Sequence, residues 1–155
     1  MNKQRELTLS RLLDAPIEKV WRAWTDPKSV AVWWGPQGVT NPVCEWNAKA
    51  GGIIHIVMLA GKELGPLAGQ RWPMRGIFKE VVPNTRLVFT NKAVDEKDET
   101  LIDGSTTVTF KSVGAKMEMT VHIIAAGKAP VAEQMLAGME TGWNQQLDKL
   151  AAFVK

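Results

Sequence analysis

The chain has 155 residues, the size of one globular domain, which we expect to span residues 1–155. Apolar side chains make up 45% of the chain and charged ones 23%, proportions that exclude disordered and fibrous proteins. The 19 basic and 16 acidic residues are scattered and leave a net charge of only +3, so we expect no nucleic-acid-binding surface. The aromatic composition is unusual, with seven Trp, four Phe and no Tyr.

The sequence also bears on location. The polar start, Met1–Arg5, predicts no secretory signal. The longest apolar run, Ile53–Ala60, is too short to cross a membrane. Cys44 is the single cysteine and has no internal disulfide partner, which is typical of the reducing cytoplasm.

The N-terminal part predicts one strand followed by two short helices. Alternation over Leu7–Leu12 indicates the strand. Asp14-Ala15-Pro16 opens the first helix, and its apolar stripe follows at helical spacing: Ile17, Val20, Trp21 and Trp24. A second helix follows Thr25-Asp26-Pro27, runs through Val30 to Trp34 and stops at Gly35-Pro36-Gln37-Gly38.

The remainder predicts a run of strands and then one long helix. The expected strands are Val43–Ala48, Ile53–Ala60, Met74–Val82, Arg86–Asn91, Thr106–Ser112 and Lys116–Ile124, with loops at Gly61–Gly69 and Val94–Gly104. Apolar residues at spacings of three and four predict a helix over Val131–Val154, about 36 Å long at 1.5 Å per residue. Because strands and helices are segregated, the fold class is α+β, a curved seven-stranded antiparallel sheet covered by the long helix.

Several segments together resemble a known family. They are RLLDAPIEKVWRAWTDPKSVAVWWGPQG at Arg11–Gly38, CEWNAKAGG at Cys44–Gly52, GIFKEVVPNTRLVFT at Gly76–Thr90, TVTF at Thr107–Phe110 and GMETGWNQQLDKL at Gly138–Leu150. The chain resembles the bacterial proteins related to the C-terminal domain of the heat-shock-protein-90 ATPase activator. These belong to the START-like, or Bet v 1-like (SRPBCC), superfamily with the helix-grip fold.

The resemblance implies a sheet that grips the C-terminal helix, with a cavity that takes lipids, polyketides or other apolar molecules in relatives. Two departures limit what is carried over. Members often have Glu-x-Asp-x-Arg before Gly-Gly, whereas this chain has Glu45-Trp46-Asn47-Ala48-Lys49. The eukaryotic activator also has an additional N-terminal domain that acts on the chaperone, and the present sequence has no room for it.

The histidines, the cysteine and the acidic loop residues, which are the types most often found in catalytic and metal sites, are predicted here to be structural or solvent-exposed. Alternation places His55 and His122 out of phase with their apolar neighbours, on the outer face of the sheet. Cys44 has no Cys or His at a motif spacing. The acidic residues of the 94–104 loop do not follow calcium-loop spacing. We therefore expect no metal and no cofactor.

The Met and Trp positions leave two interpretations open. A plain core explains a stripe at helical spacing, while the family resemblance favours an adaptable apolar pocket. The proposed lining is Trp34, Ile56, Met58, Met74, Phe78, Phe89, Met119, Met135, Met139 and Trp143. Gly138 and Gly142 weaken the helix, and we attribute them to close contact with the sheet or to room for a ligand. Of the other indoles, Trp46 and Trp72 belong on or beside the sheet, with an outward position open for Trp46.

Three function hypotheses follow. The first is non-catalytic binding of a small apolar or aromatic molecule. The second is a co-chaperone-like interaction module of the stress response, with a chaperone as its partner. The third is a cavity enzyme of cyclase or hydrolase type, for which Glu80, Arg71 and Arg75 are the candidate acid, base or charge-stabilising groups. Charged residues are mostly exposed, which favours rim or outer-face positions for these three.

Overall fold

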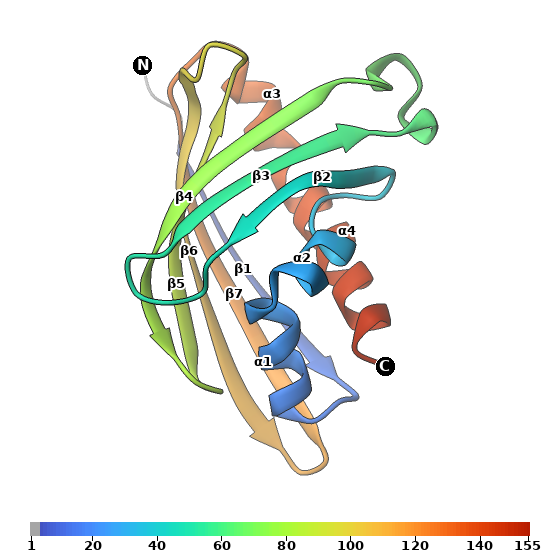
Figure 1. Cartoon of the computed structure of the whole chain (residues 1–155), viewed down its shortest axis with the longest axis vertical. Helices are drawn as coiled ribbons and strands as arrows, with labels where there is room; N and C mark the ends of the chain where they lie inside the picture. The colour runs from blue at the N-terminus through green and yellow to red at the C-terminus, as the bar shows by residue number, and fades with distance from the viewer. Residues whose placement is uncertain (1–3) are drawn as a thin grey trace.

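The computed structural model describes residues 4–155, which form one antiparallel sheet with helices on its concave side (Figure 1). The strands are β1 (Gln4–Leu13), β2 (Val39–Trp46), β3 (Ile53–Ala60), β4 (Arg71–Val82), β5 (Arg86–Val94), β6 (Thr100–Val113) and β7 (Lys116–Gly127). The helices are α1 (Ile17–Thr25), α2 (Pro27–Trp33), α3 (Ala132–Ala137) and α4 (Met139–Phe153), and η1 (Lys62–Leu67) is a 3₁₀ segment.

The seven strands follow the order β1-β7-β6-β5-β4-β3-β2. Strands β2 to β7 form a meander, and β1 closes the other edge by pairing with β7. The α+β class, the seven antiparallel strands and the two short helices after the first strand are thereby confirmed. We call the side of the sheet that faces α4 the inner face and the opposite side the outer face.

Local chemistry sets the bounds of the two short helices. Pro16 holds the extended conformation just before α1. Asp26 caps α2, because its carboxylate accepts from the Lys28 N–H and Pro27 occupies the first turn. The chain then leaves α2 through Gly35, whose φ of +88° favours glycine and whose added Cβ would lie 2.5 Å from Val39 Cγ2.

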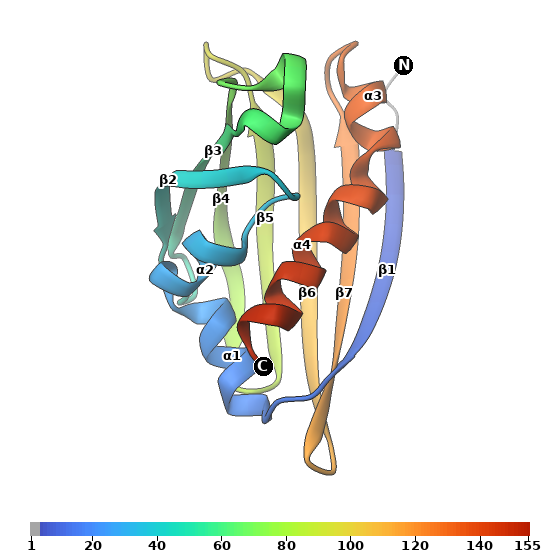
Figure 2. The same cartoon turned by 90° about the vertical axis from the view of Figure 1, so that its right-hand side faces the viewer.

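Helix α4 crosses the inner face obliquely and is held along one flank by β1 (Figure 2). Arg11 Nη1 donates to Asp148 Oδ1 at 2.7 Å, and Arg11 Nη2 donates to Asn144 Oδ1 at 3.0 Å. Arg5 donates to the Leu136 carbonyl at 2.6 Å. These two arginines lie on the inner face of the edge strand, since register pairs Arg11 with the buried Met119. They tie the helix to the sheet edge.

The expectation of one continuous helix over Val131–Val154 is wrong, because the helix is interrupted at Gly138 between α3 and α4. Gly138 has a ψ near 0°. Because glycine is a poor helix former, interrupting the helix at this residue costs little. The Ala137 carbonyl beside the break accepts from Arg5 Nη1 at 3.2 Å.

Two further expectations need correction. The predicted loop Val94–Gly104 is mostly strand, because β6 begins at Thr100 and its Asp103 projects to the outer face opposite Lys92. Only a short turn remains, in which Asp95 Oδ1 accepts from the Lys97 and Glu99 N–H groups. An outward position for Trp46 is also wrong. Its side chain is buried and packs on Phe78 and Phe89.

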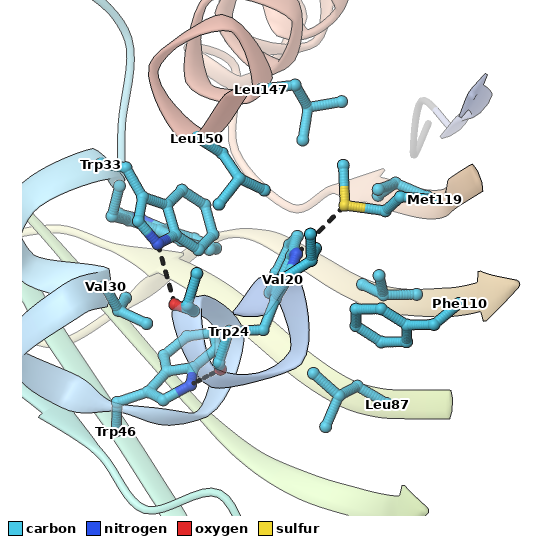
Figure 3. Packing of buried hydrophobic residues seen from close by; sticks show 14 of the residues in the cluster. Val20, Trp24, Val30, Trp33, Trp46, Leu87, Phe110, Met119, Leu147 and Leu150 are labelled. Carbon is cyan, nitrogen blue, oxygen red and sulfur yellow. Dashed lines mark hydrogen bonds between the residues drawn. The ribbon is translucent and has the colours of Figure 1, made fainter. Parts of the chain in front are cut away.

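Two indole N–H groups donate to backbone carbonyls at the C-terminal end of α1, inside the core (Figure 3). The Ala23 carbonyl would ordinarily pair with the N–H four residues on, but that residue is Pro27, which has none. Trp33 Nε1 donates to this carbonyl at 2.9 Å. Lys28 N–H is engaged by Asp26, and Trp46 Nε1 donates to the Trp24 carbonyl at 2.6 Å. Two tryptophans therefore act as buried caps.

Candidate functional site

The predicted pocket residues divide into two groups by burial. Six of them are buried in the core: Trp34, Ile56, Met74, Phe78, Phe89 and Met119. The other four are half-buried: Met58, Met135, Met139 and Trp143. All but Met135 belong to, or pack against, one hydrophobic cluster on the inner face.

Aromatic side chains fill the part of the inner face next to α1 and α2. Trp34 lies 5.2 Å from Trp46 between ring centroids, and Trp46 lies 5.1 Å from Phe78. Met119 is also engaged here, because its sulfur accepts the Trp24 indole N–H at 3.1 Å (Figure 3). This region is a packed core, so its side chains would have to move to admit a ligand.

The other end of the interface is looser. Trp143 reaches the aromatic cluster at one point, with its ring centroid 5.8 Å from that of Trp34. Met58 lies on β3 next to Gly35, where its sulfur would be 2.9 Å from an added Cβ. Trp143 and Met139 occupy successive turns of α4. We call the half-buried Met58, Met139 and Trp143, together with Gly142, the open end of the interface.

The glycines of the helical segment do not contact the sheet, and that part of their interpretation is wrong. A Cβ on Gly138 would meet only the carbonyls of Gln134 and Met135, at 3.8 and 3.9 Å. A Cβ on Gly142 would have no described heavy atom within 4 Å outside its own helix turn. Gly142 therefore faces open space, whereas Gly138 marks the break between α3 and α4.

The polar groups of the inner face were missed by sequence reasoning. Thr106 is fully buried, and its hydroxyl donates to Asn91 Oδ1 at 2.9 Å. Gln146 is 5% exposed, and its Oε1 accepts from the Gly35 N–H at 2.6 Å. Its Nε2 is buried without a hydrogen-bond partner among the described residues. A signal for Gln146 existed, because it lies seven residues after Met139 and four before Leu150, within the apolar stripe.

The 34–37 loop is fastened to the flank of α4 that faces away from β1. Besides the Gln146 contact, Gln145 Oε1 accepts from the Gln37 N–H at 2.9 Å. Lys149 Nζ donates to the carbonyls of Trp34, Gly35 and Pro36 at 3.2, 3.3 and 3.4 Å. Burial lowers the pKa of Lys149, because desolvation disfavours its charged form. The loop next to the open end is therefore fixed by three side chains of one helix.

The candidate catalytic residues all lie at the surface. Arg71 is exposed at the start of β4. Glu80 pairs with Arg86 at 3.3 Å, and Arg75 pairs with Asp98 at 2.7 Å, with about half of each side chain exposed. Arg75 also lines an outer-face groove of ≈ 540 Å³ that contains Lys79, Lys92, Asp98 and Asp103. None of the three enters the space between α4 and the sheet.

The two histidines and the cysteine are the other residues of the types common in catalytic and metal sites. His55 lies 3.5 Å from Glu45, and His122 lies 3.1 Å from Glu6, both on the outer face. Burial raises the pKa of Cys44 to about 11. Within residues 4–155, no three His, Cys, Asp or Glu side chains are grouped so that they could hold a metal ion. In the same part of the chain, no helix has the length and apolarity needed to cross a membrane.

A curved antiparallel sheet with a helix laid across its concave face, and two short helices after the first strand, defines the helix-grip class. Residues 14–155 match the family model described as Activator of Hsp90 ATPase homolog 1-like protein, and the chain belongs to this family. The family resemblance drawn from the sequence motifs is confirmed.

Solved structures agree with this assignment. A protein from Chromobacterium violaceum is 29% identical with a TM-score of 0.81, over 96% of each chain. A protein from Arthrobacter aurescens is 22% identical with a TM-score of 0.78, over 96% of this chain and 85% of that one. A family protein from Silicibacter pomeroyi is 24% identical with a TM-score of 0.74, over 96% of each chain. The last two likenesses show the fold. The search of the curated proteins found no match.

Proposed function

We propose that this protein binds a small apolar or aromatic molecule, such as a lipid or polyketide, between α4 and the sheet and does not transform it. The observation that carries the proposal is the open end of the interface. There the half-buried Met58, Met139 and Trp143 pack at the margin of the hydrophobic cluster, and a Cβ on Gly142 would meet no described heavy atom within 4 Å outside its own helix turn. The lone, half-buried Cys44 is consistent with the cytoplasm as the proposed location.

The chemistry of these side chains favours an apolar ligand. Met is unbranched and polarizable and adapts to irregular shapes, and Trp offers a large rigid face. Pockets for small molecules combine such apolar walls with few polar groups. The buried aromatic cluster behind Trp143 supplies a firm floor, because each ring is held by neighbours at 5–6 Å. We expect the deeper predicted residues, Met74 and Phe89 among them, to form that floor.

The surface positions of Glu80, Arg71 and Arg75 count against a cavity enzyme. General acid–base catalysis needs a positioned proton donor or acceptor at the substrate, and these three lie outside the proposed site. The family name mentions a chaperone ATPase, so chaperone binding is the competing outcome of the experiment.

The test is calorimetric titration of the purified protein with dodecanoic acid, naringenin and 2-acetylnaphthalene. Saturable binding of at least one compound is expected. Trp143→Ala should weaken it about tenfold, because a buried aromatic contact supplies about 1–2 kcal/mol. Phe153→Ala is the matched control, since Phe153 is an exposed aromatic residue at the far, C-terminal end of α4. No binding of any compound, together with stimulation of a purified chaperone ATPase, would favour the interaction module instead.

A further inference from the structure

The side-chain amide of Gln146 is buried, and only one of its two polar atoms has a hydrogen-bond partner among the described residues. Its orientation is determined, because only the oxygen can accept the Gly35 N–H at 2.6 Å. The two amide atoms diverge from Cδ, so Nε2 points away from that N–H. Only 5% of the residue is exposed to solvent, and Nε2 has no hydrogen-bond partner among residues 4–155.

An unpaired buried donor is costly, and most buried polar atoms in proteins have a partner. An apolar side chain at this position would avoid the cost. The stripe around Gln146 is otherwise apolar, with Leu147 and Leu150 buried beside it. The amide is therefore a directional hydrogen-bond donor enclosed by largely apolar side chains, and a ligand oxygen reaches it when those side chains move aside.

The surroundings of this donor coincide with the proposed ligand position. Gly142 lies one helical turn before Gln146, on the same flank of α4, and borders unfilled space. Gly35, which holds Gln146 Oε1, lies against Met58. Lys149, one turn after Gln145, donates to the 34–36 carbonyls and so holds the neighbouring loop in place.

We infer that the ligand carries a hydrogen-bond acceptor oxygen, a ketone, ester or carboxyl oxygen, which receives the Gln146 Nε2–H. The apolar body of the ligand then extends along Gly142 and Trp143. This inference rests on the proposed function and adds a substrate class and a specificity-determining residue to it.

The experiment compares two probes that differ in one oxygen, 2-acetylnaphthalene and 2-ethylnaphthalene. Calorimetry with the wild-type protein is expected to give about 3- to 10-fold tighter binding of the ketone, the ratio that one net hydrogen bond supplies. In ¹⁵N-resolved NMR spectra, the Gln146 side-chain amide signals should shift with the ketone and stay in place with the hydrocarbon.

The variants Gln146→Met and Gln145→Met separate the buried donor from its neighbour. Each removes an acceptor for one N–H of the 34–37 loop, but only Gln146→Met removes the buried Nε2. Gln146→Met should abolish the preference for the ketone, and Gln145→Met should keep it. Equal affinities of the wild-type protein for the two probes overturn this inference and leave the proposed function standing. If neither naphthalene binds but dodecanoic acid does, the Gln146 amide signals should shift with its carboxyl group, and the absence of that shift overturns this inference alone. Binding of none of the compounds overturns both. The wild-type spectra decide the matter even if Gln146→Met does not fold.

Discussion

Trp46→Phe tests whether the indole caps of α1 stabilise the fold. The substitution keeps one aromatic ring against Phe78 and Phe89 but removes the N–H that bonds to the Trp24 carbonyl at 2.6 Å. That carbonyl is then buried without a partner, which costs about 1–3 kcal/mol. The lost volume of the second ring adds about 1 kcal/mol, because the site is closely packed.

We therefore expect Trp46→Phe to lower the free energy of unfolding by about 2–4 kcal/mol. For a chain of this length, the midpoint of thermal unfolding should fall by roughly 5–15 °C. Urea denaturation followed by far-ultraviolet circular dichroism measures the change without using tryptophan fluorescence, which the substitution alters.

The matched control is Trp72→Phe, which removes an indole N–H from an exposed bond to Gln70. Its effect should stay within about 0.5 kcal/mol, as is usual for surface substitutions. If the two variants lose equal stability, or if Trp46→Phe loses less than the control, the capping argument is refuted.

Three further predictions concern other parts of the molecule. Arg11→Met should lower the free energy of unfolding by about 1 kcal/mol, because it removes a partly exposed ion pair with Asp148. The loss should be smaller in 1 M salt, which screens the pair. An unchanged urea midpoint in low salt would contradict the role of β1 in holding α4. Cys44 should react with Ellman's reagent at pH 8 far more slowly in the folded than in the urea-unfolded protein. A thiol pKa of about 11 leaves about one thiolate per thousand folded molecules at that pH. Equal rates would contradict the burial of the Cys44 thiol. Gly142→Ala should raise the free energy of unfolding by about 0.5–1 kcal/mol, because Ala is the better helix former and its methyl group meets no described atom; destabilisation in urea would show that the space is filled.

The sequence predicted which of these side chains face the interior but not how tightly each one is packed. Alternation assigned Ile56 to the apolar side of its strand and helical spacing assigned Trp143 to the apolar stripe of the last helix, and both pack in or against the hydrophobic cluster. The same patterns could not tell which of these positions are packed tight and which are loose. That distinction depends on ring contacts between β2, β4, β5 and α4, which are far apart in the sequence. Glu80 and Arg75 were identified only by residue type, and their ion pairs with Arg86 and Asp98 depend on strand and turn geometry.

The helix break at Gly138 shows a different limit of sequence reasoning. The apolar spacing continues from Met135 to Leu150 across the break, so periodicity predicts one helix. Propensity alone offers glycine as a weak point and does not say that the helix ends there. The carbonyls of Leu136 and Ala137, next to the break, accept hydrogen bonds from Arg5, which lies more than 130 residues earlier in the chain. Such a distant contact cannot be inferred from helix propensity.

The sequence by itself determined the α+β class, the meander of strands, the short helices and the family. These follow from local periodicity, from proline and glycine signals and from contiguous motifs. Only the tertiary structure decided what the seven tryptophans do. Trp33 and Trp46 close the end of α1, because Pro27 and Asp26 leave two of its carbonyls without backbone donors. Trp143 is left half-buried at the margin of the packed core, in contact with Trp34. An indole N–H can only donate, so its partner is a carbonyl or sulfur atom brought close by folding and cannot be inferred from spacing along the chain.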